Sequence, residues 1–165
     1  MPKLDIIQTS HVFQGLSTEQ VHRVASISGE KIYEAGQSIF RQGDRGQSLY
    51  VLEEGKVILE MGIGPRPEHG RSPQATVAVI AKGEVFGWSA LVEPHTLTLS
   101  AQAIDRCKVI AMDGIQLLEL MDSDPIMGYK VMRQLSEVIA SRLAHSWQLL
   151  LSERGLALLH QAHGY

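Results

Sequence analysis

The chain has 165 residues, of which 44% are hydrophobic and 20% charged, a composition typical of one globular domain with a sizeable core. Its net charge is -3 and its seven histidines are scattered, so it lacks the basic stripe that nucleic-acid binding needs. No segment approaches the roughly 18 consecutive apolar residues of a membrane helix, and no signal-peptide run opens the chain. We therefore expect a cytoplasmic protein that by itself binds neither nucleic acid nor membrane.

Residues 1–30 predict a short N-terminal helical segment. Ser17 and Gln20 have the spacing of a capping box, and apolar residues follow them at helical spacing. The helix is expected to end near Gly29.

Residues 31–113 predict an all-β middle. The segments are short, often β-branched, and broken by Gly or Gly-Asp turns, as in an antiparallel jelly roll or roll-like barrel. Between two of these strands, residues 62–73 hold three of the six prolines and predict an exposed hairpin loop. A tolerated surface insertion is favoured there over a partner contact.

A glycine turn follows at residues 83–94. Gly83 and Gly87 bracket a short apolar strand end, and Trp88 to Glu93 can form about one helical turn before Pro94 stops it. Backbone N–H groups at such a helix start form a concave donor site for phosphate or carboxylate, and the Ser89 hydroxyl can add to it.

Residues 114–151 predict two helices. The first ends near Asp122, and Ser123-Asp-Pro125 begins a second with proline at its first helical position. The second helix carries an apolar stripe, made by Met132, Leu135, Ile139, Leu143 and Trp147. Residues 152–165 are expected to form a disordered or loosely docked tail.

The apolar stripe has two interpretations. It can pack onto its own barrel, or it can pair with a second copy of the chain. Because the stripe continues past what one barrel can cover, we favour a homodimer. Arg142 interrupts a strict seven-residue seam, so a short contact is expected and not an extended coiled coil.

Two groups of spaced glycines carry a resemblance to a known family. The first group is Gly43-Asp44, Leu49-Tyr50 and Glu54-Gly55, and the second is Gly83, Phe86-Gly87, Ala90-Leu91 and residues 96–101. Together they resemble the cyclic nucleotide-binding domain of the catabolite-activator/fumarate-nitrate-regulator (Crp/Fnr) superfamily, over residues 13–150. The resemblance implies a mainly β fold with flanking α: an antiparallel, cupin-like jelly roll (double-stranded β-helix) with a short N-terminal helix and a long C-terminal helix. In that family the long helix pairs with the same helix of a second subunit and transmits ligand occupancy to an output domain.

The resemblance also implies a ligand site, with two departures. In the family a glutamate after the second glycine holds the sugar 2'-hydroxyl, and an arginine pairs with the cyclic phosphate; here these positions are Trp88 and His95. Losing both charged contacts should lower the binding affinity for cyclic AMP by about two to four orders of magnitude. The expected ligand is a nucleotide or another anionic or planar small molecule. The predicted ligand-binding residues are Phe86, Gly87, Trp88, Ser89, Ala90, Leu91, His95 and Thr96.

Two of these residues keep alternative roles. His95 is either a pH-dependent anion contact or a neutral structural residue. Trp88 either stacks on a planar ligand or fills the space that a nucleotide would occupy.

The sequence predicts no enzyme. It contains no His-x-His metal motif, no Gly-x-Ser-x-Gly elbow and no phosphate loop, and no cofactor or metal is predicted. Cys107 is interpreted as a core residue; as the only cysteine it excludes an internal disulfide and the ligand set of an iron–sulfur sensor.

We therefore predict a small-molecule-sensing regulatory module that forms a homodimer and acts on an unidentified output protein. Two alternatives stay open. One is a ligand-free dimerisation or docking scaffold in which Trp88 plugs the pocket. The other is the sensor half of a Crp/Fnr-type regulator, because the regulators of that family continue into a DNA-reading helix-turn-helix and this chain stops at Tyr165.

Overall fold

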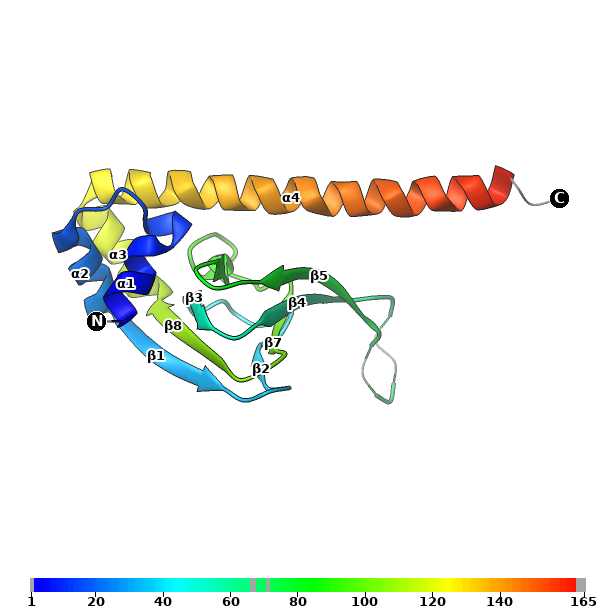
Figure 1. Cartoon of the computed structure of the whole chain (residues 1–165), viewed down its shortest axis with the longest axis horizontal. Coiled ribbons are helices and arrows are strands. Elements are labelled where there is room, and N and C mark those ends of the chain that lie inside the picture. The colour runs from blue at the N-terminus through cyan, green and yellow to red at the C-terminus, as the bar shows by residue number, and fades with distance from the viewer. Residues whose placement is uncertain (1, 66–67, 71, 163–165) are drawn as a thin grey trace.

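The computed structural model describes residues 2–65, 68–70 and 72–162; for Pro2 and residues 153–162 it describes the backbone only. Helices gather at one end of two β-sheets, and one long helix runs past the sheets (Figure 1). The α-helices are α1 (Pro2–Thr9), α2 (Thr18–Ser26), α3 (Gly114–Ser123) and α4 (Pro125–Ala162), and the 3-10 helices are η1 (His11–Phe13) and η2 (Trp88–Ala90).

The strands form two antiparallel four-stranded sheets, which confirms the predicted jelly-roll architecture. The first sheet has the order β1 (Ser28–Tyr33), β8 (Cys107–Asp113), β3 (Ser48–Glu54) and β6 (Val85–Phe86). The second has the order β2 (Ser38–Phe40), β7 (Ser100–Ala103), β4 (Val57–Gly62) and β5 (Gln74–Ile80).

The first sheet separates two hydrophobic cores. Successive side chains of a strand point to opposite faces, so Leu49 and Val51 of β3 join the core beneath the helices, whereas Tyr50 and Leu52 join the core between the sheets. We call these the helix-side core and the roll core. The β3 strand is therefore buried on both faces and reads as a continuous apolar run.

Cys107 lies in the roll core, as predicted for a core residue. It is 1% exposed, and its thiol donates to the carbonyl oxygen of Lys56 at 3.0 Å. Burial raises the pKa of this thiol. The thiol is therefore kept in its neutral form.

The predicted capping box opens α2. The backbone N–H of Gln20 donates to Ser17 Oγ at 3.2 Å, and the backbone N–H of Ser17 donates to Gln20 Oε1 at 3.0 Å. The helix ends at Ser26 and not near Gly29, because Gly29 already pairs with Ala111 in the β1–β8 ladder. Helix α1 was not among the predicted elements.

A hairpin joins β4 and β5, as predicted. The backbone N–H of Ile63 donates to the carbonyl of Pro73 at 2.7 Å, which closes the base of the loop. Residues 66, 67 and 71 of the loop lie outside the described part of the chain.

Helix α4 begins at Pro125 as predicted but continues to Ala162, so the chain does not leave the helix near residue 152. A glycine inside a helix costs only about 1 kcal/mol relative to alanine, and Gly155 is surrounded by Leu, Ala, Glu and Arg, which favour helix. The expected tail is therefore helical up to Ala162, and residues 163–165 lie outside the described range.

The predicted apolar stripe of α4 divides between core and surface. Leu135 is fully buried in the helix-side core, and Ile139 is partly buried against it. Met132, Leu143 and Trp147 are exposed, by 38%, 53% and 61%. Leu135 therefore belongs to the core of its own chain and not to a dimer face.

Candidate functional site

The turn after β6 depends on a left-handed glycine. Gly87 has φ 78° and ψ 24° and stands directly before η2. A Cβ atom at Gly87 would lie 2.9 Å from the carbonyl oxygen of Ser48 and 2.9 Å from Cδ2 of Tyr50. Only glycine fits both this conformation and this close approach.

The two glycine motifs of the sequence meet at this turn. The loop after β2 pairs with residues 95–97: Gly43 N–H donates to the Leu97 carbonyl at 2.8 Å, and Gly46 N–H donates to the His95 carbonyl at 2.7 Å. Gly46 also lies so close to η2 that a Cβ atom there would be 2.7 Å from the backbone nitrogen of Ala90. Loop and turn therefore hold each other in place.

A small cavity borders Gly87, Trp88 and Ser89. Its volume is about 30 Å³, and its other walls come from Phe40, Leu59, Leu97, Thr98 and Leu99. Small-molecule pockets usually have volumes of roughly 300–1,000 Å³. The cavity is too small for a nucleotide in this conformation.

Aromatic rings fill the neighbouring part of the roll core. Tyr50 and Phe86 stack with ring centroids 5.1 Å apart, and Phe40 lies 5.8 Å from Tyr50 and 6.0 Å from Phe86. Phe86, one of the predicted ligand-binding residues, is fully buried. In this conformation it is a core residue.

His95 borders a different cavity from Trp88. This cavity measures about 320 Å³ and is lined by Arg45, Gly46, Gln47, Ala90, His95, Asp113, Ile115 and Leu118. His95 Nδ1 lies 3.0 Å from the Ser89 carbonyl, and Nε2 lies 3.2 Å from Glu93 Oε1. The predicted site residues are thus divided: Leu91 is buried in the helix-side core, and Thr96 is exposed and bridges to Arg45.

Arg45 is a cation at this site that was not among the predicted ligand-binding residues. It borders the cavity with His95 and a second cavity of about 370 Å³, lined by Ile39, Phe40, Asp44, Gly46, Gln47, Ser48, Tyr50 and Leu97. Its backbone bridges antiparallel to Thr96. Its position directly after Gly43-Asp44 was the available signal, but only the folded chain brings that loop to η2.

Trp88 connects the turn to α4. The Arg142 guanidinium carbon lies 4.7 Å from the Trp88 ring centroid, and Arg142 Nη2 donates to the carbonyl oxygen of Val85 at 2.5 Å. Burial lowers the pKa of Arg142, whereas the charge of Glu84 raises it. The indole also packs against the helix-side core. One arginine of α4 therefore contacts both sides of Gly87.

Within the part of the chain that the structure describes, no cluster of His, Cys, Asp or Glu is arranged to hold a metal ion. None of the described helices is long and apolar enough to span a membrane.

The chain matches known proteins over most of its length. Residues 30–124 match the family of the cyclic nucleotide-binding domain. The chain is 31% identical over 134 residues to the cyclic AMP receptor protein of Thermus thermophilus, an alignment that covers 81% of this chain and 57% of that protein. It thus spans little more than half the length of that relative.

Solved structures share the fold. The catabolite activator protein of Thermus thermophilus superposes with a TM-score of 0.67 at 30% identity, covering 91% of this chain and 63% of that one. A cyclic nucleotide-binding domain from Methylobacillus flagellatus superposes with a TM-score of 0.75 over 92% of this chain and 82% of that one; at 21% identity it shows the fold alone. The glycine turn, the jelly roll and the match over residues 30–124 together place this chain in the cyclic nucleotide-binding domain family, within the Crp/Fnr superfamily.

Proposed function

We propose that this chain is a small-molecule sensor in which ligand binding beside the β6–η2 turn changes the contact between that turn and α4. The observation that carries the proposal is the position of Arg142, which contacts the Val85 carbonyl and the Trp88 ring on either side of Gly87. A ligand that moves Trp88 must alter this contact. Helix α4 would then pass the change to an output protein.

The proposed ligand is anionic. Backbone N–H groups of Gly87 to Ser89 and the side chains of Ser89 and Arg45 offer donors around the turn. The N–H groups of Ala90 and Leu91 already donate to the carbonyls of Gly87 and Trp88, and His95 can contribute once Nε2 leaves Glu93. Arg45 can supply positive charge for an anionic ligand, which the Trp88 and His95 side chains do not provide. Cyclic AMP, which the Thermus thermophilus relative is named for, is expected to bind weakly.

Binding directly beside Gly87 requires the turn to open. The cavity there holds about 30 Å³, so a nucleotide seated in it must displace Trp88 or the aromatic group around Phe40. The small size of this cavity also supports a second candidate function. In that case Trp88 closes the pocket, and the chain is a scaffold for docking.

The deciding experiment is a thermal-shift and calorimetry screen against cyclic AMP, cyclic GMP, cyclic dinucleotides, mononucleotides and small organic anions, at about pH 6 and pH 8. A sensor gives a saturable stabilising shift that Arg45→Gln weakens about tenfold or more, because a charge-assisted contact is lost. Arg106→Gln is the matched control, since Arg106 is 64% exposed and pairs with Glu34 away from the turn.

Trp88→Ala separates the two functions. For a sensor it changes ligand affinity. For a scaffold the whole panel is silent, and the substitution only lowers stability by opening a cavity. A panel that is silent in the wild type would therefore refute the sensor.

A further inference from the structure

A further cavity lies on the helix side of the first sheet. It has a volume of about 320 Å³ and lies between η1, the segment that leads into β6, and α4. Its lining residues are Ser10, His11, Val12, Gly83, Glu84, Val85, Glu137, Val138, Ser141 and Arg142. None of them borders the three cavities around η2 described above. We call it the α4 cavity.

Two buried polar atoms in its lining have no hydrogen-bond partner: Ser10 Oγ and Arg142 Nη1. Ser10 is fully buried, and its backbone N–H already donates to the Ile6 carbonyl at 3.0 Å, so the hydroxyl is not needed for the helix end. Buried hydroxyls and guanidinium groups without partners are costly and rare. A ligand that offers hydrogen-bond acceptors to these two donors would therefore be stabilised in the cavity.

The acidic residues of the cavity do not meet this need. Glu84 Oε2 accepts from the backbone N–H of Ala81 at 2.7 Å, and Glu137 Oε2 lies 3.2 Å from His11 Nε2. No ion pair with Arg142 occurs among the described residues. Arg142 is thus a partly buried cation that makes no ion pair, although the charge of Glu84 acts on it.

We propose that the α4 cavity binds a small organic monocarboxylate, with Arg142 Nη1 and Ser10 Oγ donating to its oxygens. Val12, Val85 and Val138 supply apolar walls for a short hydrocarbon body. Glu84 and Glu137 disfavour a doubly charged anion such as phosphate more than a monoanion, because the repulsion between like charges grows with the charge of the ligand. The site does not depend on the proposed ligand of the roll.

The position of the site provides a direct readout. Arg142 stacks on Trp88, so a ligand on its guanidinium changes the surroundings of that indole. The chain has two tryptophans, and Trp147 is exposed on α4. A Trp147→Phe background therefore leaves Trp88 as the single tryptophan, whose emission can be excited apart from that of the tyrosines.

The test is calorimetry and Trp88 fluorescence with hexanoate as the probe, hexanamide as its neutral match and inorganic phosphate as the multiply charged anion. We expect hexanoate to bind saturably. Hexanamide and phosphate should each bind with an affinity lower by about tenfold or more. Arg142→Gln should weaken hexanoate binding by about 10- to 100-fold, and Ser10→Ala by about 3- to 10-fold.

Three control variants keep the result interpretable. Arg106→Gln removes the same charge from an exposed position and should leave hexanoate binding unchanged. Ser10→Ala removes only a hydroxyl without a partner, so its circular dichroism and melting should show an intact fold even if Arg142→Gln unfolds. Arg45→Gln, which tests the roll ligand, should not affect hexanoate. The proposal is overturned if hexanoate does not saturate, if hexanamide binds equally well, or if Ser10→Ala and Arg142→Gln bind like the wild type.

Discussion

Gly87 shows how one residue determines the shape of the candidate site. Its positive φ turns the chain from β6 into η2, and its missing side chain lets the turn touch Ser48 and Tyr50. Gly83, four residues earlier, has a similar φ of 85°, but a Cβ atom there would meet nothing within 4 Å. Substitution at Gly83 therefore tests the cost of the left-handed conformation alone, whereas substitution at Gly87 adds the cost of steric overlap.

We expect Gly83→Ala to cost about 1–2 kcal/mol of unfolding free energy, the penalty of the left-handed conformation alone. Gly87→Ala should cost about 2–5 kcal/mol, because overpacking adds roughly 1–3 kcal/mol. Urea unfolding midpoints at equal m-values measure the difference. Equal costs for the two variants would show that the close contact with Ser48 and Tyr50 is absent in solution.

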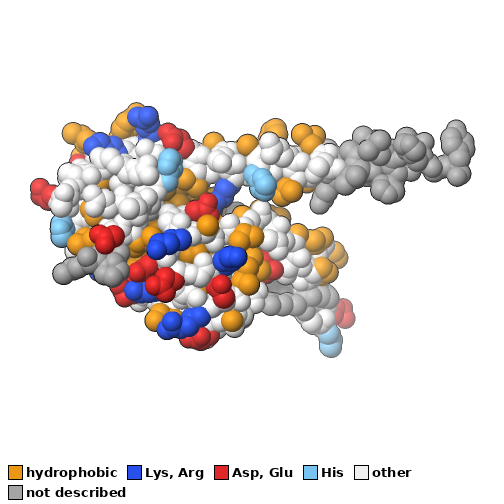
Figure 2. Space-filling model, viewed as in Figure 1, with side chains coloured by type: hydrophobic (Ala, Val, Ile, Leu, Met, Phe, Trp, Pro, Cys, Tyr) orange, Lys and Arg blue, Asp and Glu red, His pale blue; other side chains and the backbone are white. Residues whose placement is uncertain are grey.

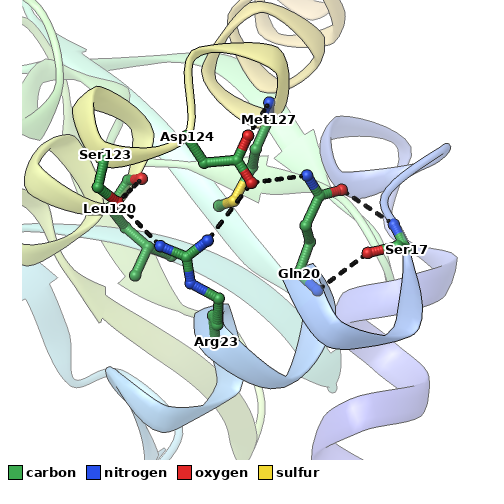
Figure 3. Close-up of polar contacts among 7 residues, drawn as sticks. All are labelled: Ser17, Gln20, Arg23, Leu120, Ser123, Asp124 and Met127. Atoms are coloured by element: carbon green, nitrogen blue, oxygen red, sulfur yellow. Dashed lines mark hydrogen bonds and ion pairs between the residues drawn. The ribbon is translucent and has the colours of Figure 1, made fainter.

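At the scale of secondary-structure elements, Asp124 joins three helices (Figure 3). Its Oδ2 accepts from Gln20 Nε2 at 2.8 Å and lies 3.4 Å from Arg23 Nη1, both on α2, and its Oδ1 accepts from the Met127 backbone N–H at 3.1 Å, in the first turn of α4. Asp124 is itself the C-cap residue of α3, directly after Ser123. Gln20 thus serves the capping box of α2 and the α3–α4 junction together.

This network predicts a pH-dependent contribution to stability. The hydrogen bond from Gln20, with that from Met127 and the charge of Arg23, lowers the pKa of Asp124. A carboxyl group whose pKa is lower in the folded state stabilises the fold above its unfolded pKa of about 4, and this stabilisation is lost as the pH falls through the folded value.

Asp124→Asn should therefore melt below the wild type at about pH 7, and the difference should shrink towards about pH 3. Calorimetric melting across this range measures it. Asp122→Asn is the matched control: Asp122 is exposed, close by in α3 and has no partner among the described residues. A difference that is independent of pH, or shared by Asp122→Asn, contradicts the network.

At the scale of the whole molecule, α4 carries apolar side chains that its own chain does not cover. Hydrophobic side chains lie along the part of α4 that passes the sheets (Figure 2). Leu143, Trp147 and Leu150 are more than half exposed, by 53%, 61% and 57%. Large exposed apolar surfaces usually mark an interface, and we propose that a second copy of this chain covers this one.

The double variant Leu143→Ser/Trp147→Ser should raise the dissociation constant of the dimer by about a hundredfold or more, because each large apolar side chain contributes about 1.5–3 kcal/mol on burial. Sedimentation equilibrium over a range of concentrations measures it. Ile104→Ser, an exposed apolar residue after β7 (48% exposed), should have no effect. A wild type that stays monomeric at every concentration would refute the dimer.

The sequence by itself determined the family and several local elements, but not α1 or the end of α4. The Ser17 capping box, the proline start of α4 and the spaced glycines act through neighbours a few residues away, so their effect is visible in the linear chain. The glycine motifs also located the turn at Gly87 correctly, because a left-handed conformation leaves little choice of residue.

The tertiary structure alone decided which of these residues meet. It separated His95 from Trp88, brought Arg45 to η2, and buried Leu135 while leaving Leu143 exposed. It also directed Arg142, which the sequence presented only as a break in a seam, onto Val85 and Trp88. These outcomes depend on contacts between segments far apart in the chain, such as Arg142 and Val85, which are 57 positions apart. No local periodicity encodes such contacts, because one helix stripe has the same pattern whether its own core or another chain covers it.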